Sequence, residues 1–181
     1  MPQQLPILQV GDSILRQTAE AIADLPDGSI DQLVADLIHT LTASHGVGIA
    51  APQVAASVRL VIVASRPNRR YPNAPMMEPV AMINPCIIAH SEQQEWGWEG
   101  CLSVPALRGF VPRYQQVEVQ YLTPKGEQKQ QVLTGFVARI FQHELDHLNG
   151  LVFLDRVKAA HHLITEAAFQ AQMHQIGLGC G

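Results

Sequence analysis

Two histidines with a glutamate between them form the feature that most constrains this chain. His143 and His147 lie within residues 134–149, which begin at a candidate N-cap threonine and are followed by a glycine, so this segment is predicted to be a helix. Side chains at positions i and i+4 leave the same helix face, so both imidazoles can reach one ion. Glu144 then has the position of a carboxylate beside a metal-bound water. The alternative is a helix that carries these residues by chance.

Composition indicates a globular protein. Of the 181 residues, 47% are hydrophobic and 15% are charged, which predicts a single catalytic domain over residues 1–181. Its core is expected over about 7–156, followed by a C-terminal helix over about 157–176 and a flexible tail over 177–181. The net charge of −4 gives no basic field, so direct binding of nucleic acid is not expected.

The chain is expected to work in the cytoplasm. No run approaches the ~20 apolar residues of a membrane span, and the polar start lacks the basic and apolar regions of a signal peptide. A membrane partner is therefore not expected. Three cysteines, Cys86, Cys101 and Cys180, are too few and too odd in number for a disulfide framework, which suits a reducing compartment.

Periodicity predicts an α+β fold, with antiparallel sheets around the central helix that bears the two histidines and with helices at both ends of the chain. Helices are predicted over residues 13–21 after Asp12, from Asp27 or Ser29 to a stop at Gly46, and over about 157–176. Strands are predicted over residues 59–64, over 81–89 with a break at Pro85, and over 117–122 and 128–133 as a hairpin.

Residues 46–53, GVGIAAPQ, place small residues on an apolar segment. Glycines let the backbone approach a ligand closely, and Gln53 offers a side-chain amide to a polar substrate. A tight turn in a packed core explains the same residues equally well.

Cys101 is the more informative cysteine. It lies within residues 95–105, EWGWEGCLSVP, a glycine-flanked polar segment that is a poor place to bury a thiol for packing, whereas Cys86 is expected to be a small buried apolar residue. A catalytic metal on two imidazoles needs at least one more protein ligand and an open position. Cys101, Asp155, Glu166 or another acid are the candidates.

Three ordered motifs make the chain similar to the peptide deformylases. Residues 46–53 match the family's motif GxGxAAxQ, residues 99–103 are its motif EGCLS, and residues 142–147 are its motif QHExDH. The resemblance runs from about residue 7 to about residue 156.

This resemblance implies a metal-dependent hydrolase. Cys101, His143 and His147 are expected to bind one divalent ion, with Fe²⁺ as the native ion and Zn²⁺, Ni²⁺ or Co²⁺ as others that a soft thiolate site accepts. Glu144 is expected to act as general base and then as general acid. The Gln53 amide and the Leu102 backbone N–H are expected to hold the oxyanion.

The implied substrates are N-formylmethionyl nascent peptides, and the products are formate and a free N-terminus. Val47 and Gly48 on an exposed edge, with Gly100 opposite, are expected to pair with the peptide as an added strand. The methionine pocket is expected to be walled by four residues and flanked by a fifth, Arg108. The four walls are Val47, Phe136, Ile140 and the aliphatic stem of Glu99. On the predicted helix, Phe136 and Ile140 share the face of the histidines.

Arg113 is expected to pair with Asp146 and so orient the metal-bearing helix. A surface ion pair is the alternative for both Arg108 and Arg113.

Two other functions compete with this interpretation. A zinc endopeptidase of the His-Glu-x-x-His type would cut internal bonds of unblocked peptides. A metal-binding adaptor would have a closed ion site, which leaves Glu144 and Gln53 unexplained. A formyl-methionine substrate implies the cytoplasm of a bacterium more than the mature form of an organellar protein. Contact of the last helix with the ribosome is a further expectation that the sequence leaves open.

Overall fold

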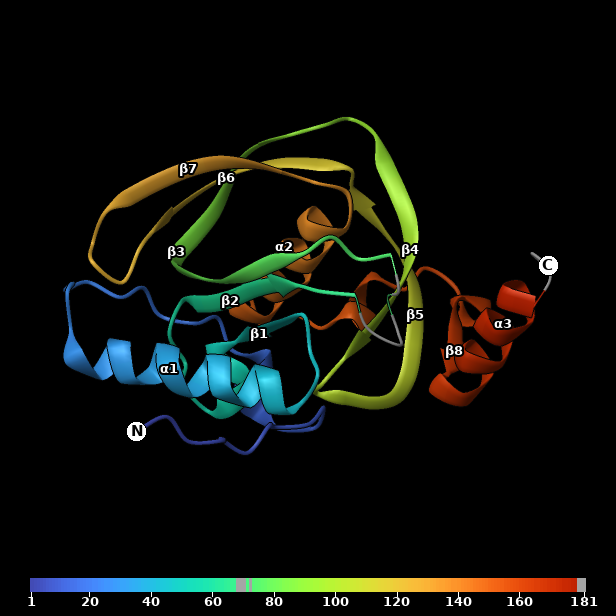
Figure 1. Ribbon diagram of the computed structural model, residues 1–181, viewed down its shortest axis with the longest axis horizontal. Coiled ribbons are helices and arrows are strands. Elements are labelled where there is room, and N and C mark those ends of the chain that lie inside the picture. The colour runs from blue at the N-terminus through green and yellow to red at the C-terminus, as the bar shows by residue number, and fades with distance from the viewer. Residues whose placement is uncertain (68–70, 72, 179–181) are drawn as a thin grey trace.

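Two antiparallel sheets and three α-helices form an α+β fold in the computed structural model, whose described residues are 1–67, 71 and 73–178 (Figure 1). The larger sheet has the order β1 (Gly48–Ala50), β2 (Leu60–Ser65), β3 (Met77–His90), β6 (Gln116–Leu122) and β7 (Gln128–Thr134). The smaller sheet has the order β4 (Gln94–Cys101), β5 (Val104–Tyr114) and β8 (Leu163–Thr165). The α-helices are α1 (Gly28–Ala43), α2 (Gly135–Leu148) and α3 (Glu166–Leu178).

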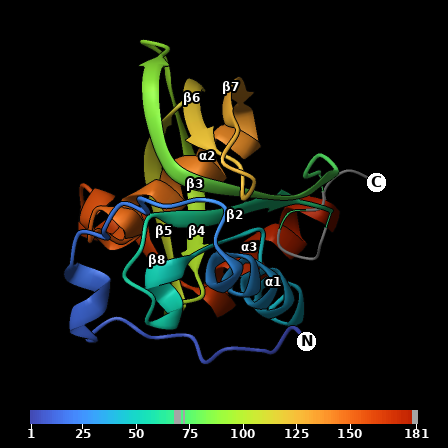
Figure 2. The same ribbon diagram turned by 90° about the vertical axis from the view of Figure 1, so that its left-hand side faces the viewer.

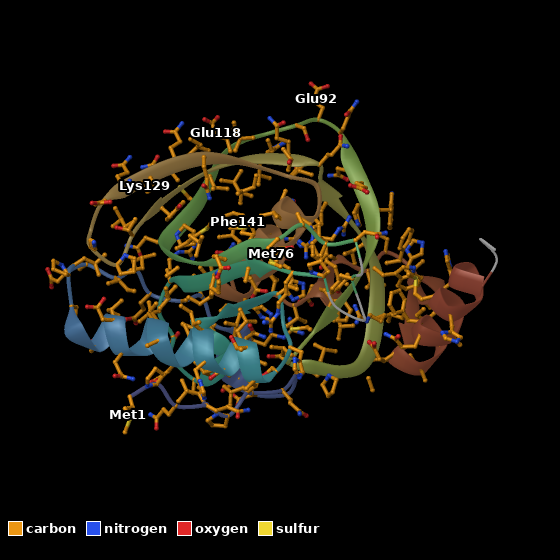
Figure 3. All side chains as sticks on the ribbon, viewed as in Figure 1. Met1, Met76, Glu92, Glu118, Lys129 and Phe141 are labelled. Atoms are coloured by element: carbon orange, nitrogen blue, oxygen red, sulfur yellow. The ribbon has the colours of Figure 1, made fainter. Side chains whose placement is uncertain are left out.

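Strand β2 is apolar from Leu60 to Ala64 because a helix covers each of its two faces. Successive side chains of a strand point to opposite faces. Val61 and Val63 pack in one hydrophobic cluster with α2, whereas Leu60 and Ile62 pack in another with α1. Phe141 of α2, labelled in Figure 3, is fully buried in the first cluster. The first cluster fixes α2 against one face of the larger sheet, and the second fixes α1 against the other face.

Helix α2 has the bounds that its sequence predicts. Thr134 is its N-cap and Asn149 its C-cap, and Gly150 follows with a positive φ of 72°. Figures 1 and 2 show α2 in the middle of the molecule, whereas α1 and α3 lie at the periphery of the molecule. Along the described chain, no α-helix is long and apolar enough to cross a membrane.

The N-terminal region is less helical than its sequence predicts. Asp12 caps a single 3-10 turn, Ser13–Arg16, by accepting a hydrogen bond from the Ile14 N–H. The chain then continues away from that turn, and the Ala19 N–H donates to the carbonyl of Leu148 at the end of α2. Tertiary pairing therefore replaces the predicted helix over residues 17–21.

Helix α1 is capped by Asp27, as predicted, but it stops before Gly46. Ser44 is its C-cap, and the next residue, His45, takes the left-handed conformation with φ 53°. The glycine is needed one position later, where a methyl group would collide with the Leu41 side chain.

Two expectations for β3 are wrong. The strand is not broken at Pro85, because a register shift between Ile83 and Cys86 accommodates the missing N–H. Cys86 is exposed rather than buried, because its side chain falls on the solvent face of the strand. The predicted hairpin of β6 and β7 is confirmed.

The C-terminal region also differs from its prediction. The helix begins at Glu166, not near residue 157, because Leu163–Thr165 pair as β8 with Leu107, Arg108 and Gly109 of β5. Residues 177–178 close α3 and are not part of a tail. Residues 179–181, which include Cys180, lie outside the described residues.

Candidate active site

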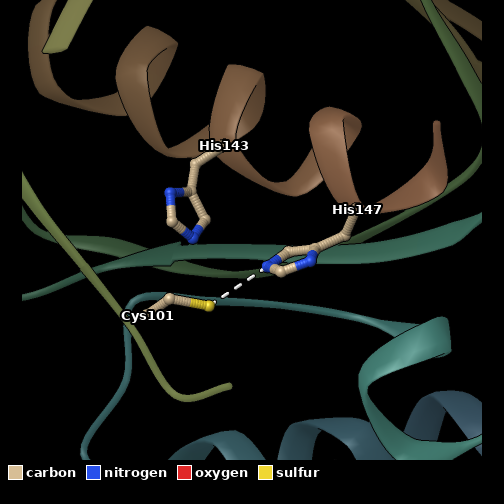
Figure 4. Close-up of side chains that lie close together, drawn as sticks. All are labelled: Cys101, His143 and His147. Atoms are coloured by element: carbon tan, nitrogen blue, oxygen red, sulfur yellow. Dashed lines mark hydrogen bonds between the residues drawn. The ribbon is translucent and has the colours of Figure 1, made fainter. Parts of the chain in front are cut away.

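One sulfur and two imidazoles converge at the cleft side of α2 (Figure 4). Cys101 ends β4, and His143 and His147 lie one helical turn apart on α2. The Cys101 Sγ is 3.2 Å from the His147 Nε2, and ligand atoms of all three residues lie within 4.8 Å of one another. Metal–sulfur and metal–nitrogen bonds of about 2.3 and 2.0 Å place such atoms around one ion.

The other two candidates for the third ligand are engaged elsewhere. Asp155 binds Arg16 and accepts a hydrogen bond from the Val152 N–H. Glu166 binds Arg108. Of the three residues that the sequence offers, only Cys101 meets the histidines.

A register shift in the smaller sheet directs the Cys101 side chain toward the two histidines. The register of β4 against β5 shifts between Glu99 and Cys101, and such bulges re-aim a side chain. The Ser103 N–H and the Gln53 amide then donate to the sulfur, at 3.4 and 3.5 Å. These donors favour the thiolate, which is the form that binds metal.

Glu99 orients the first histidine. Its carboxylate lies 2.9 Å from the His143 Nδ1, and because a carboxylate only accepts, Nδ1 donates and Nε2 remains for a ligand. Arg113 and Arg139 also bind this carboxylate, which is 4% exposed. Glu99 lines the cleft as expected, but its carboxylate belongs to this network.

Neighbouring charges set the protonation of these groups. Burial alone raises the pKa of Glu99, but Arg113 and His143 outweigh it and hold that pKa well below its usual range. Burial likewise raises the pKa of the Cys101 thiol, and the His147 and His143 rings outweigh it, so the pKa lies well below normal. The cluster therefore stabilises a thiolate.

The carboxylate of Glu144 has different surroundings from that of Glu99. Its side chain is 4% exposed, and within the described chain its Oε2 has no hydrogen-bond partner. Burial raises its pKa to about 7. The backbone of Gly48 lies so close to this carboxylate that a methyl group there would collide with it. The residue thus holds a carboxylate at the cleft that can take and give a proton near neutral pH.

The Gln53 amide is fixed at both ends. Its Oε1 accepts from the Ala50 N–H at 2.8 Å, and its Nε2 donates to the Ser103 Oγ at 3.0 Å. It lies in the 3-10 turn Ala51–Val54, directly after β1. This anchoring directs the amide N–H group toward the cysteine.

The cleft lies between the edges of the two sheets, where β1 ends one sheet and β4 ends the other. All the residues predicted to bind substrate or oxyanion line it, namely Val47, Gly48, Gln53, Glu99, Gly100, Leu102, Arg108, Phe136 and Ile140. Gly48 itself is buried rather than exposed, because α2 packs against it.

The predicted ion pair of Arg113 with Asp146 is confirmed. Their side chains meet at 2.6 Å, and both are buried. Arg113 also binds Glu99, so one guanidinium joins α2 to the residue that orients His143.

Several residues of the site escape prediction from spacing alone. Arg139 lies four positions before His143 on the same helix face, so helical periodicity is the signal that could have found it. Ser103 lies within the EGCLS segment but carries no charge to attract notice. Tyr71 comes from a proline- and arginine-rich loop, and its ring lies 4.7 Å from that of Phe136.

Comparisons with known proteins identify the family of this chain. The sequence model of the polypeptide deformylase family matches residues 4–162. The chain belongs to this family. Peptide deformylase 2 of Nostoc sp. is 57% identical over 169 residues, which cover 93% of this chain and 94% of that protein. Peptide deformylase 2 of Shewanella oneidensis is 49% identical over 84% of this chain and 83% of its own length.

Solved deformylase structures have the same fold. The class I type b peptide deformylase from Acinetobacter baumannii with Met-Ala-Ser bound has a TM-score of 0.85 and 48% identity, over 87% of this chain and 100% of that chain. The peptide deformylase from Thermotoga maritima has a TM-score of 0.77 and 34% identity, over 87% and 99%. This deformylase family member is thus an enzyme, a hydrolase of protein biosynthesis, and the α+β fold expected from its sequence is confirmed.

Proposed function

We propose that this chain removes the formyl group from the N-terminal formyl-methionine of newly made polypeptides and releases formate. The observation that carries the proposal is the unpartnered Glu144 oxygen beside the cluster of Cys101, His143 and His147. A buried carboxylate without a partner is costly to keep, so a reacting group is its best explanation. The Met-Ala-Ser bound to the Acinetobacter baumannii relative is the tripeptide that such a reaction would leave.

The three converging donors fit one divalent ion. We propose that Cys101, His143 and His147 hold Fe²⁺ in the cell, and that Zn²⁺, Ni²⁺ or Co²⁺ can replace it in the purified protein. A soft thiolate beside two imidazoles suits these ions better than Mg²⁺ or Ca²⁺. When bound, the ion supplies a Lewis acid that lowers the pKa of water and polarises a carbonyl.

Glu144 moves the proton in this proposal. Its Oε2 accepts a proton from the attacking water and then delivers it to the departing amine nitrogen. A pKa of about 7 suits both steps at neutral pH.

Gln53 and Leu102 stabilise the developing charge. The Gln53 Nε2–H and the Leu102 backbone N–H donate to the formyl oxygen as it becomes negative. One N–H of Gln53 stays on the Ser103 Oγ, and the other, which makes a long 3.5 Å contact with the Cys101 sulfur, is the one that would turn to the formyl oxygen.

The peptide is proposed to bind as an added strand. Val47 and Gly48 of one sheet edge and Gly100 of the other would supply its backbone partners. The methionine side chain would enter the pocket of Val47, Phe136 and Ile140, with the stem of Glu99 and the guanidinium of Arg108 at its wall.

The setting is proposed to be the bacterial cytoplasm, because the curated relatives named above are bacterial. The partner is the nascent chain, and contact with the ribosome is part of the proposal. No direct binding to nucleic acid or membrane is proposed. The organisation as a single catalytic domain over residues 1–181 stays a prediction.

The test is formate release from formyl-Met-Ala-Ser by protein purified without air. Acetyl-Met-Ala-Ser and an unblocked casein-like protein are the matched alternatives. We expect formate from the formyl peptide, little turnover of the acetyl peptide because the cleft beside Glu144 is narrow, and no cut in the unblocked chain. Cleavage of internal bonds would favour the zinc endopeptidase instead.

A further inference from the structure

A buried arginine forms part of one wall of the cleft. Arg108 is 1% exposed, and it comes from the middle of β5. A methyl group built on Gly100 would come within 2.9 Å of the Arg108 Cζ, so the guanidinium packs against the backbone of that glycine. Gly100 separates Glu99, which orients His143, from Cys101. The position of Arg108 therefore affects the position of the Gly100 backbone, which is part of the wall that faces the proposed peptide site.

Helix α3 holds this guanidinium. Glu166, the first residue of α3, accepts from the Arg108 Nε at 2.5 Å and from its Nη2 at 3.3 Å. Phe169, one turn later, places its ring 4.8 Å from the Arg108 Cζ. The Tyr71 hydroxyl lies 2.7 Å from Nη1. Two of these partners thus come from a helix that does not reach the metal ligands.

We propose that Glu166 is a positioning residue for peptide binding, acting through Arg108 on the Gly100 wall. The two-pronged bond fixes the plane of the guanidinium, which otherwise has many rotamers. Without it, Arg108 keeps its charge in a buried place and must tilt or seek solvent, and the backbone that rests on it shifts. The inference rests on the proposed function, because the affected ligand is the formyl-peptide.

The effect should fall on binding more than on chemistry. All four residues Gly48, Gly100, Arg108 and Glu144 line one cleft. The proposed function places the peptide along Gly100 and Arg108, and it places the formyl group at Glu144 and Gln53. Loss of an interaction made equally in ground and transition states raises KM and leaves kcat unchanged.

The experiment uses Glu166→Gln, which preserves size but removes the charge. We expect KM for formyl-Met-Ala-Ser to rise about tenfold, the size of a lost hydrogen bond to a charged group, with kcat within about twofold. Calorimetric titration with Met-Ala-Ser should show the same loss of affinity. Gln172→Ala, an exposed change on the same helix, should alter neither quantity. An unchanged KM in Glu166→Gln would overturn the proposal.

A double-mutant cycle separates positioning from general support of the helix. On an Arg108→Met background, Glu166→Gln should add no further rise in KM, because the guanidinium that it holds is gone. Additive effects would mean that Glu166 acts by another route. If Glu166→Gln fails to fold, Glu166→Asp tests the same point, with a smaller rise in KM expected and no rise counting against the proposal.

The outcome also distinguishes the two proposals. A wild-type protein that releases no formate contradicts the proposed function. An active wild type whose KM ignores Glu166 contradicts only the positioning role.

Discussion

The two sides of α2 shift the pKa of a buried carboxylate in opposite directions. On the cleft side, Glu144 lies against Gly48 with one oxygen unpartnered, and burial raises its pKa to about 7. Two residues later and on the other side, Asp146 is also buried, yet the hydrogen bonds and charges of Arg156 and Arg113 outweigh burial and lower its pKa. The paired carboxylate stabilises the fold, and the unpaired one is available for chemistry.

The ion pairs on the Asp146 side of α2 also support the residues on its cleft side. Arg113 binds Asp146 with one nitrogen and Glu99 with two others, and Glu99 in turn orients His143. The network therefore connects the side of α2 away from the cleft to His143, one of the proposed metal ligands, and restricts its orientation.

The sharpest test of the comparison removes the unpaired carboxylate. Glu144→Gln should lower kcat by ~10²–10⁴, the usual contribution of a positioned acid–base group, while metal content stays the same. Glu92→Gln, a change of the same kind at an exposed site, should leave both unchanged. Formate release and metal analysis measure the two effects. Retention of most of the rate would show that Glu144 is not the base.

Replacing the arginines that pair with Asp146 should lower stability rather than the rate of reaction. Arg113→Met removes a buried charged partner from both Glu99 and Asp146 and should cost ~3–5 kcal/mol of unfolding free energy. Arg156→Met removes the other partner of Asp146, but this side chain is 44% exposed, so its cost should stay at or below ~1 kcal/mol. Denaturant unfolding measures the unfolding free energy of both variants. Equal losses would show that burial does not determine how much these ion pairs stabilise the fold.

Glu99 connects the two sides, so its replacement should weaken the metal site without removing a ligand. Glu99→Gln is expected to lower metal affinity by ~10–100-fold, as for other groups that orient a metal-binding histidine. Competition with a chelator measures this. An unchanged affinity would mean that His143 is oriented by helix packing alone.

The smallest expected effect is a change in how the unfolding free energy depends on pH in the acid range. Glu99 and Asp146 have folded-state pKa values below their unfolded values, so their contribution to stability is full above about pH 5 and is lost as pH falls from there through the lowered values. Arg113→Met removes part of that lowering, so its unfolding free energy should change less steeply with pH in this range. Equal slopes for the two proteins would contradict the assignment.

Sequence reasoning predicts the parts of this molecule that depend on local chemistry. The bounds of α2 follow from its periodicity and its end residues, and the hairpin of β6 and β7 follows from alternation and its turn. The convergence of Cys101 with the two histidines does not follow from spacing, because it depends on a bulge in another sheet. The resemblance of three motifs supplies that link.

Tertiary pairing explains what sequence reasoning misses. Strand β5 contains Pro105 and Pro112, and proline usually interrupts a strand, yet both lie outside the short stretch that pairs with β8. A proline is tolerated where one edge of a strand is unpaired. Leu163–Thr165 fit a helical stripe as well as they fit β8, and only the presence of β5 decides between the two.

The most direct test of the central claim is anomalous diffraction at the absorption edge of the bound metal, from crystals of protein purified without air. The account predicts one anomalous peak about 2.3 Å from the Cys101 sulfur and about 2.0–2.1 Å from the Nε2 atoms of His143 and His147, with Glu144 outside bonding distance. A peak elsewhere, or one that the Cys101 sulfur does not reach, would contradict it.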